Sequence, residues 1–307
     1  MSNFSIYNHV KLGIVHFKAY PQVVNGTGPI VETLRKIVED DFWTAVEVGM
    51  VKDVKVRNEV RNLLETSHME VAYASQSKIL SNKLNLNSLD KSERRVAIGS
   101  LKSAIEEAYH LGATRMRIMS GKDPGADKRE EAKDIFADSL TELIEYSNSL
   151  GNMYITLKIF DRDIDKCALI GHFSDAADVA EVVSKRVKNF GLLSDLSHFP
   201  LLREDPKEAL EKVKKYSLDF HIGNCVMRDK LNPMYGDLQP RFGVPGGEID
   251  TPDVQNYFQI LKDMKLIGPD KMPVLSAEVR PLLAAESSEV IVTNTKRVIK
   301  EAWAAVK

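Results

Sequence analysis

The chain has 307 residues, a formal net charge of −2, 43% hydrophobic residues and 28% charged residues. These values are typical of a globular protein with a large core, and no basic block stands apart from acidic residues, so nucleic acid is not an expected partner. Cys167 and Cys225 lie far apart without the spacing of a metal site, which indicates a reducing compartment. Because we find no signal-peptide pattern and no apolar run near the roughly 18 residues of a membrane span, we expect a cytoplasmic protein without membrane contact.

Short apolar runs alternate with helical patterns along the whole chain. We predict eight strands, at Val10–Phe17, Thr44–Val48, Met69–Ala74, Thr114–Met119, Met153–Phe160, Phe190–Pro200, Tyr216–Cys225 and Met272–Arg280. After each strand, the spacing of apolar residues predicts a helix: Ile30–Asp41, Val54–Leu64, Leu89–Leu111, Arg129–Leu150, Ser174–Lys188, Pro206–Tyr216, Thr251–Met264 and Ser288–Val306.

Eight strand–helix units without an interrupting linker predict an α/β protein, a single (β/α)8 TIM barrel over residues 1–307. The alternative is a doubly wound open sheet. Such a sheet usually has a glycine-rich first turn between strand and helix, and the segment GIVHFKAYP at that place is not one. In barrels of this kind the chemistry lies at the carboxyl ends of the strands.

Three predicted strands in succession carry, toward their carboxyl ends, residues that can bind a metal ion: Asp195, His221 and Glu278. Two carboxylates and an imidazole suit a divalent ion such as Mn, Mg, Co or Zn with open positions for substrate. Such an ion would hold a carbonyl oxygen and a neighbouring hydroxyl, and would stabilise the enediolate formed when the proton between them leaves. The alternative is structural: Asp195 caps its loop and His221 is a buried histidine with satisfied hydrogen bonds.

Further polar residues are expected around this rim. His198 is close enough in sequence to Asp195 to contact the same substrate or to orient that carboxylate. Glu47, at the end of the second strand, is a candidate for the pocket wall. The long loop Asn224–Glu248 offers side chains for substrate oxygens or a charged group, namely Arg228, Tyr235, Asp237 and Arg241. The alternative for each loop residue is a solvated surface position.

Several motifs resemble the xylose-isomerase-like superfamily of sugar and sugar-phosphate isomerases and epimerases. They are VEVGMVKD, MSGKDPG, FDRDIDKCALIG, LLSDLSHFPLL, FHIGNCVMRD, YGDLQPRFGVPGGE and SAEVRP, and they span nearly the whole chain. The resemblance implies one divalent ion held by residues at the ends of strands five to eight. It places Asp195, His221 and Glu278 among these ligands, and His198 at a histidine that touches substrate or metal.

Strand five departs from the pattern of the family. Where the family usually has a glutamate that binds metal and moves a proton, this chain has Lys158, with Asp161 three residues further on. A protonated lysine cannot be a ligand, and its charge opposes a cation. Three arrangements follow: Asp161 replaces the glutamate, three residues alone hold the metal, or Lys158 occupies the place of the cation.

The resemblance implies an enzyme of carbohydrate metabolism, an isomerase or epimerase acting on a small sugar, sugar phosphate or keto acid. We expect Glu278 to act as base, with Lys158 and His198 as further catalytic residues. One alternative is a lyase that works through the same enolate and needs a single base. A second is a catalytically inactive or partner-dependent barrel subunit. A homo-oligomer is compatible with the sequence.

Overall fold

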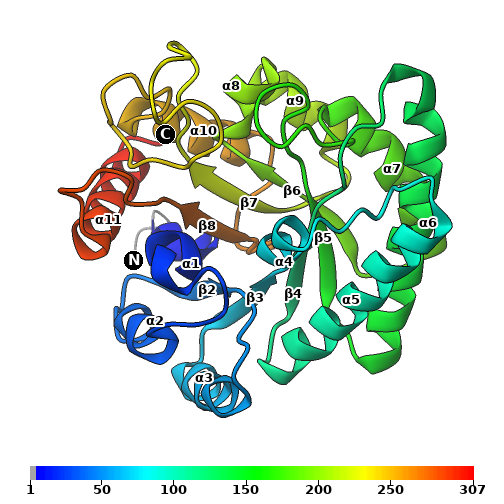
Figure 1. Ribbon diagram of the computed structural model, residues 1–307. Coiled ribbons are helices and arrows are strands. Elements are labelled where there is room, and N and C mark those ends of the chain that lie inside the picture. The colour runs from blue at the N-terminus through cyan, green and yellow to red at the C-terminus, as the bar shows by residue number, and fades with distance from the viewer. Residues whose placement is uncertain (1–4) are drawn as a thin grey trace.

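The computed structural model describes residues 5–307 as a closed barrel of eight parallel strands in chain order, with β8 pairing back onto β1 (Figure 1). The strands are β1 (Lys11–Val15), β2 (Ala45–Val48), β3 (Glu70–Ala74), β4 (Arg115–Ile118), β5 (Tyr154–Lys158), β6 (Phe190–Asp195), β7 (Ser217–Gly223) and β8 (Val274–Glu278). The predicted (β/α)8 architecture is therefore confirmed.

Helices surround the barrel on the outside (Figure 1). The predicted helices correspond to α2 (Ile30–Val38), α3 (Val54–Ser67), α5 (Lys91–His110), α6 (Arg129–Leu150), α7 (Phe173–Arg186), α9 (Pro206–Val213), α10 (Thr251–Asp263) and α11 (Ser288–Ala304). Aspartates cap several of them: Asp53, Asp90 and Asp205 each accept hydrogen bonds from two backbone amides of the first turn. Among the residues 5–307, no helix is both long enough and apolar enough to cross a bilayer.

Three short helices were not predicted: α1 (His16–Ala19), α4 (Gln76–Ser81) and α8 (His198–Leu202). They lie in the segments that follow β1, β3 and β6, on the side of the barrel where the strands end. Each has six residues or fewer, which is too short for an apolar periodicity to be recognised in the sequence. The segment from 224 to 250 follows β7 and lies beside α10, in yellow in Figure 1.

The interior of the barrel contains charged side chains as well as apolar ones. Arg117 of β4 is completely buried, and its Nε donates a hydrogen bond to Glu47 Oε2 at 3.0 Å. One terminal nitrogen donates to Asp219 Oδ2 at 2.5 Å and to Thr156 Oγ1 at 2.9 Å. The guanidinium thus pairs with two buried carboxylates. Asp219 also pairs with Arg115 at 3.2 Å, and Glu47 extends toward the mouth of the barrel.

Replacing Arg117 with methionine is expected to destabilise the fold by about 3–5 kcal/mol, because the buried carboxylates of Glu47 and Asp219 both lose their guanidinium partner and keep only His221 and Arg115, respectively. The free energy of unfolding in urea measures this effect. Arg186→Met is the matched control, since Arg186 pairs with Asp138 on the surface and the two side chains are 45% and 70% exposed. The control should lose less than about 1 kcal/mol, and equal losses for the two variants would contradict the proposed role of Arg117.

Candidate active site at the mouth of the barrel

The carboxyl ends of β5 to β8 bring four predicted residues together: Lys158, Asp195, His221 and Glu278. The strand register explains this, because Asp195 is paired with His221, and Gly223 of the same strand is paired with Glu278. Lys158 pairs with Leu193, two residues before Asp195. All four side chains are buried, and we call them the central cluster.

The ammonium group of Lys158 is the centre of this cluster. Its Nζ lies 2.8 Å from Asp195 Oδ2, 2.5 Å from Glu278 Oε2 and 3.3 Å from His221 Nδ1. The ring of Phe160 lies on another side of the ammonium, with its centroid 5.1 Å from Nζ. A single positive charge therefore touches both carboxylates and the imidazole.

Both oxygens of Glu278 have cationic partners. Oε1 lies 2.8 Å from Nζ of Lys18, which belongs to α1, and Oε2 contacts Lys158 and His221 Nδ1. The other ring nitrogen of His221, Nε2, lies 3.1 Å from Glu47 Oε2. Glu47 thus joins the central cluster to Arg117, and the hydrogen bonds continue without interruption from the barrel interior to its mouth.

Burial and charge act in opposite directions on the pKa values of these groups. Burial alone would raise the pKa of Glu47, but His221 and Arg117 lower it to about 2. Burial likewise opposes ionisation of Asp195 and Glu278, yet the nearby Lys158 holds the pKa of both carboxyls below their usual values. Burial would lower the pKa of Lys158, and the carboxylates raise it instead. The cluster is therefore held together in its ionised form.

Asp195, His221 and Glu278 alone could hold a metal ion, since each offers a ligand atom within 4.8 Å of the others. Divalent ions lie about 2.0–2.2 Å from such ligand atoms, which places the ion in the space between them. In the structure this space contains Nζ of Lys158. A divalent ion does not fit there while the lysine keeps this position.

His198 lies on the other side of Asp195, at the start of α8. Its Nε2 is 3.8 Å from Asp195 Oδ2 and 3.5 Å from Asp237 Oδ1, and the edge of its ring packs against Phe160. Within residues 5–307, neither ring nitrogen has a hydrogen-bond partner, although the side chain is buried. A buried imidazole without partners is suited to bind a ligand, because leaving its polar atoms unpaired is costly.

Asp161 does not reach the central cluster. Its carboxylate accepts hydrogen bonds from the backbone amides of Ile164, Asp165 and Lys166, at 2.6–3.1 Å. These bonds shape the loop after β5, and Nζ of Lys166 in that loop lies 3.0 Å from Asp237 Oδ2. Asp161 therefore shapes the loop after β5, and Lys166 of this loop binds Asp237 of the segment 224–250, close to His198.

Of the four residues predicted in the loop after β7, Asp237 lies beside His198, and the other three lie apart from the cluster. Arg228 is largely exposed and pairs with Glu248 at 3.2 Å. Arg241 pairs with Glu286 at 3.1 Å, and Tyr235 is half-buried in the same loop. A role for these residues in substrate binding stays a prediction.

An open cavity of about 710 Å³ includes Lys166, which belongs to the loop after β5, in its wall. Lys83 and Lys122 line the same cavity, together with Ser120 and Gly121, which directly follow the end of β4. Its other walls are mainly apolar, formed by Ile79, Leu80, Leu84, Val96 and Met119. The cavity thus combines three lysines, of which Lys166 is already paired with Asp165 and Asp237, with Glu93 and an apolar surface next to the mouth of the barrel.

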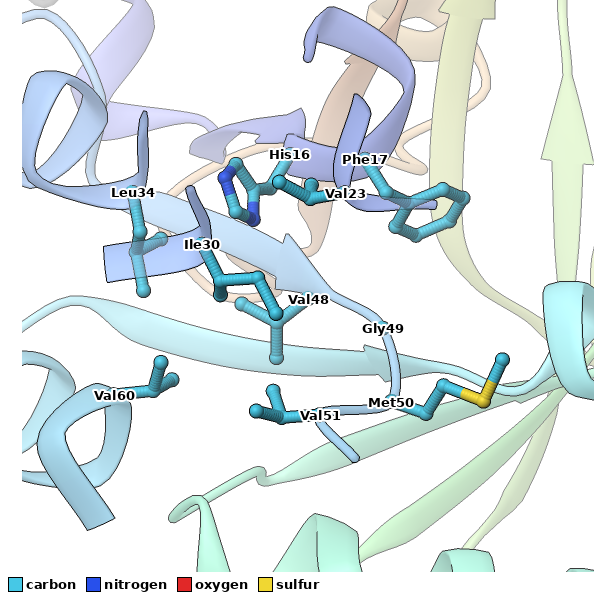
Figure 2. A pocket seen from close by; sticks show the side chains of 10 residues that line it. All are labelled: His16, Phe17, Val23, Ile30, Leu34, Val48, Gly49, Met50, Val51 and Val60. Atoms are coloured by element: carbon cyan, nitrogen blue, oxygen red, sulfur yellow. The ribbon is translucent and has the colours of Figure 1, made fainter. Parts of the chain in front are cut away.

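His16, where the first predicted strand ends, belongs to the core. Burial lowers its pKa to about 3, and its Nε2 lies 2.8 Å from Thr33 Oγ1. Figure 2 shows its imidazole near Val23 and Ile30, at a small apolar pocket between the ends of β1 and β2. A volume of about 10 Å³ leaves no room for more than a water molecule, so this pocket is not a substrate site.

Comparison with known proteins agrees with the fold. A family model described as xylose isomerase-like TIM barrel matches residues 37–290. The chain belongs to this family. No curated protein matches the chain.

Three solved structures illustrate the similarity to other xylose isomerase-like barrels. A D-tagatose 3-epimerase-like protein has a TM-score of 0.69 and 17% identity, with 97% of this chain and 98% of that chain covered. The IOLI protein with a bound zinc atom has a TM-score of 0.72 and 17% identity, with 97% and 99% covered. The 3-keto-D-glucoside 4-epimerase YcjR from E. coli has a TM-score of 0.67 and 14% identity, with 95% and 99% covered. At these identities the likeness shows the xylose isomerase-like fold alone.

Three residues that matter for the geometry of this xylose isomerase-like site were not predicted. Lys18 lies in a segment without a recognisable motif. Arg117 gave a signal that could have been used, since an arginine in a strand buried on both faces needs a partner. Gln239 is buried with φ = 58°, and its Nε2 donates to Asp237 Oδ1 at 2.7 Å and to Ser197 Oγ at 3.0 Å. Such backbone strain is frequent at functional sites, but it is not visible in a sequence.

Lys158→Met is expected to cost about 3–5 kcal/mol of stability at pH 7, because Asp195 then remains buried without its ammonium and Glu278 loses one of its two ammonium partners. In the wild type these carboxylates have lowered pKa values, so their contribution is present at neutral pH and is lost as the pH falls. In the variant, burial without the ammonium should raise the pKa of Asp195 above that of the unfolded chain, about 3.9, whereas Glu278, which keeps Lys18 and His221, should move less. The difference in stability between wild type and variant should therefore shrink as the pH is lowered from 7 to 5.

Urea unfolding at the two pH values tests this expectation. A difference that is the same at pH 7 and pH 5 would show that Lys158 does not neutralise the two carboxylates. Lys102→Met provides a control for the removal of a lysine, since Lys102 pairs with Glu142 on the outside of the barrel and the two side chains are 32% and 52% exposed. Its effect should be small and should depend little on pH over this range.

Proposed function

We propose that this protein is an isomerase that moves a proton between neighbouring carbons of a sugar, or of a keto acid derived from one. The observation that carries the proposal is a fixed ammonium, Lys158, held between two carboxylates and an imidazole at the mouth of a barrel. Other xylose isomerase-like barrels include sugar epimerases, which supports a hydroxy-carbonyl compound as substrate. The unpaired nitrogens of His198 add hydrogen-bonding capacity beside the same point.

In this proposal the substrate carbonyl approaches Nζ of Lys158 and takes over a hydrogen bond that Glu278 receives in the free protein. Glu278 loses part of the charge that stabilises its ionised form, and its carboxylate becomes more basic. It then takes the proton from the carbon next to the carbonyl. The electron pair of the broken C–H bond moves to the carbonyl oxygen, where the ammonium stabilises the enediolate.

Isomerisation is completed when Glu278 returns the proton to the neighbouring carbon on the same face. Meanwhile the hydroxyl proton passes from one substrate oxygen to the other, and His198 is placed to carry it. One base is sufficient for this reaction. Epimerisation needs an acid or base on each face of the substrate, and the raised pKa of Lys158 makes it unsuited to act as the second base. The geometry therefore favours an isomerase over an epimerase.

The four groups of the cluster are at most 6% exposed, so a substrate reaches them only if a covering segment moves. The loop after β5 and the segment 224–250 are joined by Lys166 and Asp237, and opening this contact would free the approach to His198. The cavity lined by Lys83, Lys122 and Lys166 can then receive the far end of the substrate. Its ammonium groups favour a carboxylate or phosphate at that end.

A lyase is the second candidate, and His198 is the observation that favours it. A buried imidazole near Asp195 could protonate a leaving hydroxyl after Glu278 has removed the neighbouring proton. The enediolate would then lose water instead of being protonated. The same single base serves both reactions, so the fate of the intermediate decides between them.

Incubation in D2O with a panel of ketoses, aldoses, sugar phosphates and keto acids tests the proposal. NMR should show one deuterium at the carbon next to the carbonyl, together with the isomeric product. Lys158→Met and Glu278→Gln should each slow this exchange by about 100-fold or more, because each removes a group that acts in the transition state. Arg186→Met, on the surface, serves as the control.

The products distinguish the two candidates. Loss of water with the appearance of an ultraviolet-absorbing enone would identify a lyase. Exchange that continues at the wild-type rate in Lys158→Met and Glu278→Gln would contradict the proposal, because it would place the chemistry elsewhere in the protein.

A further inference from the structure

The IOLI protein, one of the similar structures, has a bound zinc atom, whereas the central cluster of this protein holds an ammonium group. We propose that the ammonium of Lys158, assisted by Lys18, permanently replaces the divalent metal ion in this protein. As a statement about catalysis the inference rests on the proposed function. As a statement about the cation it rests on the geometry alone and can be tested without a substrate.

The ammonium of Lys158 occupies the position that a metal ion would take. Nζ of Lys158 lies among the three ligand atoms that would surround a metal ion, and it contacts all three residues. The lysine side chain is 2% exposed, and Phe160 packs against its end.

The charges of the two carboxylates are already balanced by lysines. Asp195 and Glu278 carry two negative charges, which in a metal site a divalent ion would balance. Here Lys158 bridges the two carboxylates, and Lys18 contacts the remaining oxygen of Glu278 at 2.8 Å. The two lysines together supply the same charge as one divalent ion. A metal ion added to this arrangement would bring two further positive charges into a buried site that is already neutralised.

The side chains that would bind a metal ion already have other partners. Oε1 of Glu278 is paired with Lys18, and Oε2 contacts both Lys158 and His221. The second ring nitrogen of His221 is paired with Glu47. Asp195 Oδ1 accepts hydrogen bonds from the amide and the hydroxyl of Ser197. A metal ion would have to break several of these bonds, whereas the ammonium of Lys158 is present together with all of them.

The experiment that tests this inference replaces the ammonium at position 158 with a carboxylate that can bind a metal ion. Lys158→Glu removes the ammonium and adds a carboxylate at the end of β5, which completes a set of three carboxylates and one imidazole. We expect this variant to bind close to one Zn²⁺ or Mn²⁺ per chain, because four such ligands suit either ion. Its melting temperature should rise when the metal is added and fall with EDTA. The matched control is Lys158→Gln, which removes the charge without adding a carboxylate, and it should bind metal far more weakly.

The wild-type protein is analysed in parallel, after expression with added zinc and manganese and purification without chelator. We expect far less than one ion per chain by elemental analysis, and a melting temperature that EDTA does not change. A wild-type protein that carries close to one ion per chain, removable by EDTA with loss of stability, would overturn the inference. A folded Lys158→Glu variant that takes up no metal would overturn it as well, since Lys158 would then not stand in a metal position.

If Lys158→Glu fails to fold, as judged by circular dichroism, the metal content of the wild type alone decides. These results are independent of the activity assays. A metal-free wild type that isomerises no sugar would leave this inference intact and contradict the proposed function. An isomerase that contains zinc at the cluster would do the reverse.

Discussion

Buried carboxylates without a cation are among the most expensive features a protein interior can have, and the mouth of this barrel gathers several of them. Glu47, Asp195 and Glu278 meet within one connected group of hydrogen bonds. The structure satisfies this constraint with Arg117 from below, Lys158 at the centre and Lys18 on the outer oxygen of Glu278. The ionised state of the cluster, its stability and its proposed chemistry all depend on these three positive charges.

Much of the fold could be predicted, because each strand and each long helix carries its own periodic signal. The carboxyl ends of parallel strands meet at one rim, so Asp195, His221 and Glu278 could be brought together from their positions alone. The short helices could not be predicted in this way, since four to six residues show no period. Helix α1 matters most among them, because it carries Lys18 to the far oxygen of Glu278.

The sequence could not predict which side chains near the candidate site point into it. Asp161 stands close to Lys158 in sequence, but its carboxylate turns to the amides of its own loop. That choice depends on three backbone donors converging, which no residue pattern announces. Arg228 and Arg241 found acidic partners within or next to their own loop for a similar reason. In each case a nearby partner competes with the distant centre, and only coordinates show which contact forms.

The placement of Lys158 at the end of β5 also bears on how such a centre can arise. Codons for glutamate and lysine differ in their first base alone, so one point mutation suffices to exchange the two residues. The exchange converts a ligand into the cation that the remaining ligands would otherwise have to recruit. Descent from a metal-dependent ancestor would then require no intermediate with a vacant centre, and independence from trace-metal supply would follow in a single step.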